Sequence, residues 1–196
     1  MPKQNHTEII FILDKSDSMN SIKTDAIGGF NAYIDSQKKL EGTASITLIL
    51  FNTERKIVYS NISINEVPLL TEQSYVPNGC TALLDTIGFV IDSVGHRLNQ
   101  TLEDERPQKV MICILTDGEE NSSKKFTNQQ IQKKIEHQRT VYSWEFSYLG
   151  ANQDAFAIAK NLNIDSKYTA NFAANSRGVC DAYASLSRMT QTYRKS

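Results

Sequence analysis

The chain has 196 residues, of which 40% are hydrophobic, enough to fill the core of one domain without disulfide bonds. Its formal net charge of −1 argues against a general electrostatic attraction to nucleic acid or to an anionic membrane. We therefore expect a single domain over residues 1–196, monomeric when alone, that contacts neither nucleic acid nor membrane directly.

The cysteines and the N-terminal segment predict a cytoplasmic protein. Cys80, Cys113 and Cys180 are widely spaced and form no CxxC pair, so neither a zinc site nor a disulfide framework is expected. Cys113 lies in an apolar run and is expected to be a buried thiol, as in a reducing compartment. The first residues are polar and do not resemble a secretory signal, and the apolar runs are too short to span a membrane.

The first half of the chain predicts two buried strands and an edge strand. Residues 9–13 form an apolar run typical of a strand buried on both faces, and residues 21–40 have apolar side chains at helical spacing. A second apolar run at 45–51 is joined by a tight turn at 52–54 to a more mixed segment at 56–62. So short a connection predicts that the mixed segment is an antiparallel edge strand.

The second half continues the alternation of helices and strands. Residues 84–98 predict a helix, residues 110–115 form the most apolar run and predict a central strand, and residues 127–139 predict a weaker helix. Aromatic residues alternate with polar ones over 142–148, which suggests a half-covered strand. The remaining elements are a short helix at 153–161, a strand at 168–172 and a helix at 179–193. This alternation predicts an α/β fold: a doubly wound, mostly parallel sheet with one antiparallel edge strand and helices on both faces.

Oxygen-bearing side chains gather where the predicted strands end. Residues 14–18 follow the first strand, residues 116–121 follow the most apolar strand, and residues 79–83 precede a helix. Ligands of such sheets bind beyond the carboxyl ends of the strands, where the strand order reverses. Carboxylate and hydroxyl oxygens suit a hard divalent cation such as Mg²⁺. The candidate metal ligands are Asp14, Ser16, Ser18, Thr81 and Asp117.

These residues, in this order, resemble the metal-ion-dependent adhesion site (MIDAS) of von Willebrand factor A and integrin I domains. The resemblance rests on Asp14-x-Ser16-x-Ser18, then Thr81, then Asp117, and extends over nearly the whole chain. It implies a Rossmann-like fold and a bound Mg²⁺, or Mn²⁺ or Ca²⁺ in its place. It also implies that the cation captures an Asp or Glu of a partner protein.

Two other segments refine the resemblance. Residues 149–155 are similar to a stretch of small stand-alone bacterial or phage A domains. Asp17 stands where many relatives have glycine. It removes no ligand, but it adds negative charge that can tighten cation binding or repel an acidic partner.

Some of these residues also have purely structural interpretations. Asp14 and Ser16 are residue types that cap helices, although we expect Ser18 or Ser21 to cap the first helix. Thr81 precedes a predicted helix and can act as a cap, alone or together with metal binding. The metal interpretation is favoured because three separate segments converge.

The other polar residues of the last loop are not predicted to be ligands. Glu119 and Glu120 are expected to be solvated loop acids, and Asn121 is expected to cap or steady the loop. Lys124 and Lys125 are expected to form an exposed pair that can meet an acidic partner.

A metal-dependent hydrolase, such as a phosphatase, is the alternative function. A bound Mg²⁺ can polarise a phosphoryl oxygen. However, the sequence has no Walker loop and no GxGxxG turn, and His6, His96 and His137 lie outside the candidate site loops. We therefore predict no catalytic residue and favour a binding module over an enzyme.

Overall fold

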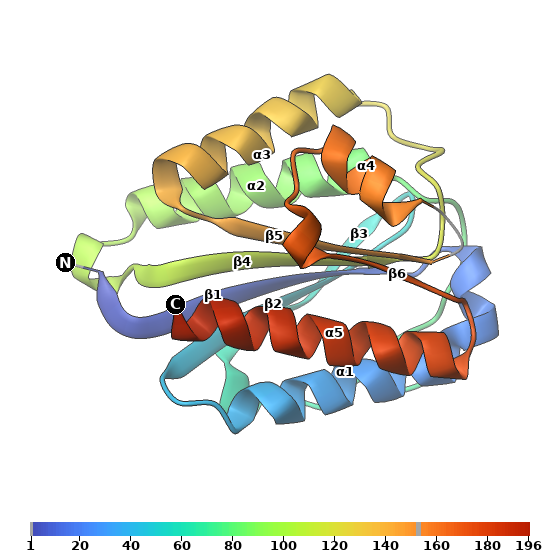
Figure 1. Ribbon diagram of the computed structural model, residues 1–196, viewed down its shortest axis with the longest axis horizontal. Coiled ribbons are helices and arrows are strands. Elements are labelled where there is room, and N and C mark those ends of the chain that lie inside the picture. Colours follow the sequence, from blue (N-terminus) through green and yellow to red (C-terminus); the bar gives the residue numbers. More distant parts are fainter. Residues whose placement is uncertain (1, 152–153) are drawn as a thin grey trace.

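The computed structural model describes residues 2–151 and 154–196 and contains a six-stranded sheet in the order β3-β2-β1-β4-β5-β6 (Figure 1). All neighbouring strands are parallel except β2 and β3, which form the antiparallel edge. This confirms the predicted fold class. The strands are β1 (Lys3–Asp14), β2 (Thr43–Phe51), β3 (Arg55–Ser63), β4 (Pro107–Thr116), β5 (Glu145–Ala151) and β6 (Thr169–Phe172).

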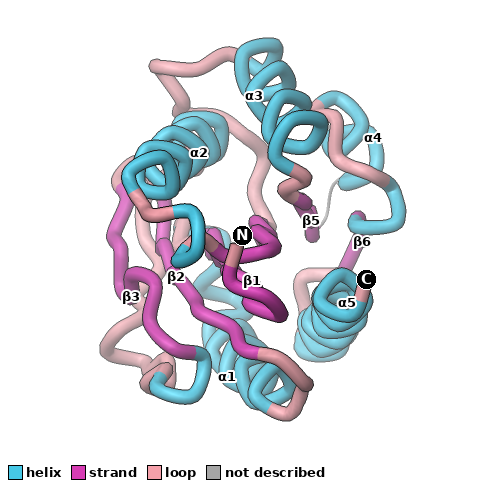
Figure 2. Tube along the Cα trace, turned by 90° about the vertical axis from the view of Figure 1, so that its left-hand side faces the viewer, coloured by secondary structure: helices cyan, strands magenta, loops and turns pink. Residues whose placement is uncertain are grey.

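Helices cover both faces of the sheet, as the end-on view in Figure 2 shows. One face carries α1 (Lys23–Lys38) and α5 (Ser176–Lys195), and the other carries α2 (Leu83–Gln100), α3 (Asn128–Tyr142) and α4 (Ala155–Asn161). Alternate residues of each central strand point into the two separate cores, which is why the strands read as continuous apolar runs. Among the described residues, no helix combines the length and apolar character needed to cross a membrane.

The first helix starts differently from the prediction. A 3-10 helix (Asp17–Ile22) precedes α1, so the expected single helix over 21–40 is divided. The expected cap from Ser18 or Ser21 is wrong. Ile22 is the residue before α1, and the Ser21 hydroxyl donates instead to the backbone oxygen of Ser18. The 3-10 turn lets the Ser18 side chain face the end of the sheet.

Strand β5 is buried on both faces rather than half-covered. Phe146 and Tyr148 pack into the core under α2 and α3, whereas Leu149 and Ala151 pack into the core under α1 and α5. The pattern also included Tyr142, which is instead the last residue of α3. The prediction failed because β6 and α4 extend the sheet and its cover beyond β5.

The strand order reverses between β1 and β4, which are neighbours. The chain leaves β1 toward α1 on one face and leaves β4 toward α3 on the opposite face (Figure 1). Leu13 pairs with Leu115, so the two strands end at the same level. The loops after β1 and β4 therefore leave the same edge of the sheet toward opposite faces, at the right-hand end of the sheet in Figure 1, which is where ligands of such sheets bind.

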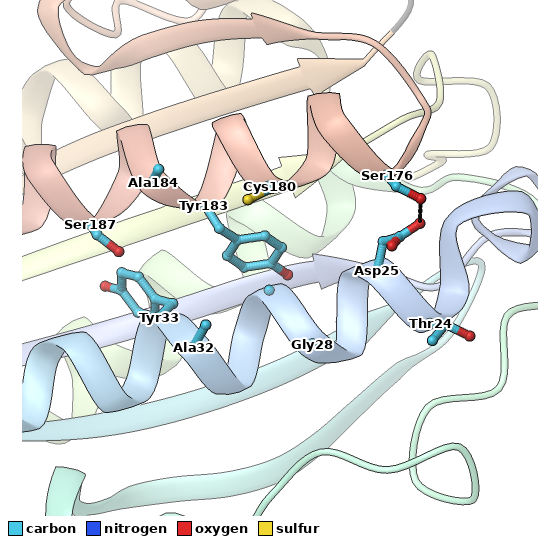
Figure 3. A pocket seen from close by; sticks show the side chains of 11 residues that line it. Thr24, Asp25, Gly28, Ala32, Tyr33, Ser176, Cys180, Tyr183, Ala184 and Ser187 are labelled. Atoms are coloured by element: carbon cyan, nitrogen blue, oxygen red, sulfur yellow. Dashed lines mark hydrogen bonds between the residues drawn. The ribbon is translucent and has the colours of Figure 1, made fainter.

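Helices α1 and α5 pack unusually closely at one glycine. Figure 3 shows the Tyr183 ring of α5 lying against α1, and the ring also stacks on Phe11 with centroids 6.1 Å apart. A Cβ atom at Gly29 would lie 2.1 Å from Cδ2 of Tyr183. A hydrogen bond of 2.8 Å from the Ser176 hydroxyl to Asp25 joins the same two helices. The absence of a side chain at Gly29 thus sets the distance between these helices.

Two adjacent glycines test this packing. We expect Gly29→Ala to lower the unfolding free energy by about 1 to 3 kcal/mol, because the tyrosine ring must move. Gly28→Ala is the matched control, since a Cβ there meets nothing within 4 Å. It should be neutral or stabilising by up to about 1 kcal/mol, because alanine is the better helix former. Urea unfolding measures both, and equal effects would contradict the packing described here.

Candidate functional site

Asp14 is the most firmly held of the predicted site residues. Its side chain ends β1 and is completely buried. The Ser16 N–H donates to Oδ1 at 2.6 Å, and the Thr116 hydroxyl at the end of β4 donates to Oδ2 at 2.5 Å. The Tyr75 hydroxyl donates to the Asp14 backbone oxygen at 2.5 Å. Asp14 is thus fixed at both its carboxylate and its backbone.

Hydroxyl groups connect the loop after β1 to the loop after β4. Ser16 Oγ lies 3.1 Å from Ser18 Oγ, and the Ser18 hydroxyl donates to Asp117 Oδ1 at 2.6 Å. Two residues far apart in the sequence, Ser18 and Asp117, therefore meet directly at the carboxyl end of the sheet.

A small space beside Gly118, in the loop after β4, is bordered by oxygen atoms from the other two site segments. A Cβ atom at Gly118 would lie 2.8 Å from Thr81 Oγ1. The same atom would lie 3.7 Å from Asp14 Oδ2 and from Ser16 Oγ. Thr81 is buried, and its hydroxyl makes no hydrogen bond within residues 2–151 and 154–196. The absence of a side chain at Gly118 leaves this space open.

The set of oxygen atoms fits a hard cation. Asp14 and Asp117 contribute carboxylates, and the other three predicted residues contribute hydroxyls. In the described part of the chain, no group of three or more His, Cys, Asp or Glu side chains is placed to hold a metal. A cation here would thus depend on neutral hydroxyl oxygens for part of its coordination, as Mg²⁺, Mn²⁺ and Ca²⁺ tolerate and softer metals do not favour.

Asparagine side chains and backbone contacts hold the loops together. The backbone N–H of Asn78 donates to the backbone oxygen of Lys15 at 2.8 Å. The backbone N–H of Asp17 donates to the backbone oxygen of Gly79 at 2.9 Å. The Asn52 amide donates to the Asn78 backbone oxygen at 2.6 Å. Sequence reasoning assigned Asn52 only to a hairpin turn. No local pattern could reveal its second role, because its acceptor is 26 residues away.

The supporting role of Tyr75 was also missed by sequence reasoning. It lies in the loop before α2, where no hydrophobic periodicity marks it as buried. Its side chain is nevertheless completely buried. The only signal in the sequence was that Tyr75 is the one aromatic residue between β3 and α2.

The polar residues of the loop after β4 divide into two groups. Glu119 is exposed, as predicted, and so are Lys124 and Lys125. Glu120 is not a solvated acid: its carboxylate accepts hydrogen bonds from backbone N–H groups, including that of Leu84 at the start of α2. Asn121 steadies the loop as predicted, because its Oδ1 accepts the N–H of the Thr81 backbone at 3.0 Å.

Two further expectations concern Thr81 and Asn152. Ala82, not Thr81, is the residue before α2, and the interpretation of Thr81 as the helix cap is therefore wrong. We also expect Asn152 to join the site loops, because it follows a parallel strand, but it lies outside the described residues, as does part of the 149–155 segment.

The surroundings of Asp14 and Asp117 disfavour the charged form of both carboxyl groups. Burial raises the pKa of Asp14 to about 6, against the lowering effect of the Thr116 and Ser16 hydrogen bonds, and the nearby Asp117 charge adds to the rise. Burial also raises the pKa of Asp117, although the Ser18 hydroxyl opposes the shift. Two acids brought together under such conditions are typical of a functional site rather than of a structural one.

Asp14→Asn tests the buried charge through the pH dependence of stability. The Asp14 pKa of about 6 in the folded protein exceeds the ordinary value of 3.8, so between these values the folded state binds more protons than the unfolded chain. Stability from this group is therefore present at low pH and is lost as the pH rises through about 6. Asparagine keeps the size of the side chain but does not titrate.

In EDTA, we expect wild type to lose about 2 to 3 kcal/mol of unfolding free energy relative to Asp14→Asn between about pH 4 and pH 7. Urea unfolding at a series of pH values measures this difference. Parallel curves for the two proteins would contradict a buried charge at Asp14.

Comparison with protein-family models and with curated proteins found no match. Solved structures, however, are similar over 95% of this chain. Proximal thread matrix protein 1 from the mussel byssus, in a form with a zinc-occupied MIDAS motif, is 14% identical with a TM-score of 0.63. The von Willebrand factor type A structure from Catenulispora acidiphila is 16% identical with a TM-score of 0.61.

A third structure matches in length as well. The vWF domain of the type V pili tip protein Mfa5 from Porphyromonas gingivalis is 9% identical with a TM-score of 0.64, and 95% of each chain is covered. By contrast, this chain spans only 46% of the mussel chain and 42% of the Catenulispora chain. The similarity in overall structure shows that the chain has the von Willebrand factor A fold.

Proposed function

We propose that this protein is a metal-dependent module for binding other proteins, in which a divalent cation is held by Asp14, Ser16, Ser18, Thr81 and Asp117. The main observation in support is the space beside Gly118, where oxygen atoms of Thr81, Asp14 and Ser16 come together from two segments next to the loop that contains Asp117. The order of the five residues resembles a MIDAS, and a similar structure has its MIDAS motif occupied by zinc. We propose Mg²⁺ here, with Mn²⁺ or Ca²⁺ as alternatives, because all the oxygens are hard ligands.

The charge of the site favours an acidic partner. Asp14 and Asp117 are the only carboxylates in the proposed ligand set, and the hydroxyls are neutral. When bound, the cation supplies a positive charge and an open position for an Asp or Glu of the partner. The carboxylates of Asp17 and Glu119, both exposed, weaken this attraction, whereas exposed Lys124 and Lys125 can pair with other acids of the partner.

The positions of the histidines support binding over hydrolysis. His6 lies on β1 near its start, His96 near the end of α2, and His137 on α3, and the last two line a groove between these two helices. None of the three lies on a loop that contributes to the site, so a general base of the usual kind is absent from the proposed machinery. A turnover assay with phosphate esters in Mg²⁺ would distinguish a hydrolase from a binding module.

The cellular location stays a prediction. Cys80, Cys113 and Cys180 are free thiols, which fits the reducing cytoplasm. Two of the similar structures come instead from a byssus and from a pilus tip. We propose the cytoplasm for this chain on its cysteines alone.

Metal binding is the first test of the proposal. Mg²⁺ or Mn²⁺ at 100 times its dissociation constant should raise the unfolding free energy by about 2.7 kcal/mol. Asp117→Ala should abolish this rise, and Glu119→Ala, which removes a charge from the same loop, should keep it. Calorimetry giving Asp14→Ala/Asp117→Ala the wild-type affinity for both metals would refute the assignment.

Capture of a carboxylate is the second test. A peptide array pairs each Glu- or Asp-containing peptide with its Gln or Asn counterpart, and is probed in Mg²⁺ and in EDTA. We expect wild type to prefer acidic peptides in Mg²⁺ only. Thr81→Val, which keeps the shape but lacks the oxygen, should weaken this capture more than it weakens Mg²⁺ binding.

The lysine pair provides the control for the array. Lys124→Ala/Lys125→Ala should have a smaller effect, because exposed ion pairs contribute about 0 to 1 kcal/mol each. Equal binding of acidic peptides with and without EDTA would argue against capture through a metal.

A further inference from the structure

Helix α2 is capped differently from the helices that follow it. In α3, α4 and α5 the residue before the helix acts as the cap, because the side chains of Thr127, Asp154 and Asn175 each accept the N–H three residues later. Helix α2 is preceded by Ala82, whose side chain has no acceptor. The N–H groups of its first turn must therefore find acceptors elsewhere.

Those acceptors come from the loop after β4. Glu120 Oε2 accepts the Leu84 N–H at 2.8 Å, and Ser123 Oγ accepts the Asp85 N–H at 3.0 Å. The Ser123 hydroxyl donates to the same Glu120 oxygen at 2.7 Å. The other Glu120 oxygen accepts the N–H groups of Ser122 and Ser123 at 2.9 and 2.7 Å. Glu120 thus caps the helix and folds the loop at the same time.

The helix binds the loop in return. The Asp85 carboxylate, in the first turn of α2, accepts the N–H groups of Lys124, Lys125 and Phe126 at 2.9, 2.8 and 2.9 Å. Burial alone would raise the pKa of Asp85, but these three N–H groups hold it below its usual value. The start of α2 and the loop that contains Asp117 are therefore held together from both sides.

This arrangement decides what the Thr81 hydroxyl can do. Thr81 stands three residues before Leu84, but it lies one residue further from its helix than Thr127 does, because Ala82 directly precedes α2. A threonine hydroxyl can accept a backbone N–H a few residues away, so the Thr81 hydroxyl would be an alternative acceptor for the Leu84 N–H if Glu120 did not take it. Because Glu120 already occupies that N–H, the hydroxyl faces the space beside Gly118, 2.8 Å from a Cβ placed there.

We propose that Glu120 is a positioning residue of the metal site: it caps α2 in place of Thr81 and so keeps the Thr81 hydroxyl available to the cation. The metal part of this inference rests on the proposed function. The exchange of caps, in which Thr81 replaces Glu120 as the acceptor at the start of α2, does not rest on the proposed function, because it can be measured in EDTA.

The first experiment measures the exchange of caps without metal. In EDTA, Thr81→Val should change the Tm of wild type little, because the hydroxyl makes no hydrogen bond among the described residues. In the Glu120→Ala background the hydroxyl becomes the cap, so Thr81→Val should lower the Tm by about 2 to 4 °C. The same shift in both backgrounds would overturn the proposal.

The second experiment measures Mg²⁺ affinity by calorimetry. Glu120→Ala should weaken binding about 10- to 100-fold, as is typical when a residue that orients a metal ligand is lost. Glu119→Ala is the matched control: it removes the same charge from an exposed neighbour that makes no hydrogen bond or ion pair within the described ranges, and its effect should be much smaller. Equal losses in both variants would mean that Glu120 acts only through its charge, and would overturn the proposal.

Two outcomes separate this proposal from the function it rests on. If wild type binds neither Mg²⁺ nor Mn²⁺, the proposed function fails. The Tm values of Thr81→Val in the two backgrounds, measured in EDTA, still show whether Glu120 and Thr81 exchange as the cap of α2. If Glu120→Ala does not fold, Glu120→Gln replaces it, since the amide keeps one acceptor oxygen but presents an NH₂ group where acceptors are needed. The same directions of change are expected for it.

Discussion

A carboxylate buried where two parallel strands end is the feature on which the proposed site depends. Asp14 is removed from water at the end of β1 and is joined to β4 by the Thr116 hydroxyl. Burial of an ionised carboxylate is unfavourable unless partners compensate for it. Here the hydrogen bonds compensate only in part, because the Asp14 pKa still rises to about 6. A divalent cation in the adjacent space would supply the missing positive charge, so the burial of Asp14 fits the proposed function.

The loops around Asp14 are held by hydrogen bonds to their backbones rather than by a core of their own. Tyr75 donates to the Asp14 backbone, Asn52 donates to the Asn78 backbone, and Asn121 accepts the N–H of Thr81. Each of these side chains fixes a segment without using a candidate ligand oxygen. Such preorganisation keeps the hydroxyl and carboxylate oxygens pointing at one place.

The scaffold behind the loops tolerates almost complete change of sequence. The similar structures are only 9 to 16% identical to this chain, yet their TM-scores exceed 0.6. A sheet buried on both faces needs apolar residues of about the right size, and many combinations satisfy that need. The placement of loops at the carboxyl ends of β1 and β4 follows from the topology of the sheet and does not depend on which apolar residues fill its cores.

The sequence alone determined the fold class, the central strands, the antiparallel edge strand and the segments that follow the strand ends. The apolar runs at 9–13 and 110–115 identified the central strands, and the turn at 52–54 identified the antiparallel edge. These signals are local, because periodicity and turn chemistry depend on near neighbours in the chain. Only the tertiary structure decided that β5 is buried on both faces, that Tyr75 supports Asp14, and that Glu120 caps α2. Their partners lie far away in the sequence, 61 residues for Tyr75 and Asp14 and 36 for Leu84 and Glu120. Which polar groups come within hydrogen-bond distance is set by how helices and loops pack on the sheet, and no local pattern in the sequence contains that information.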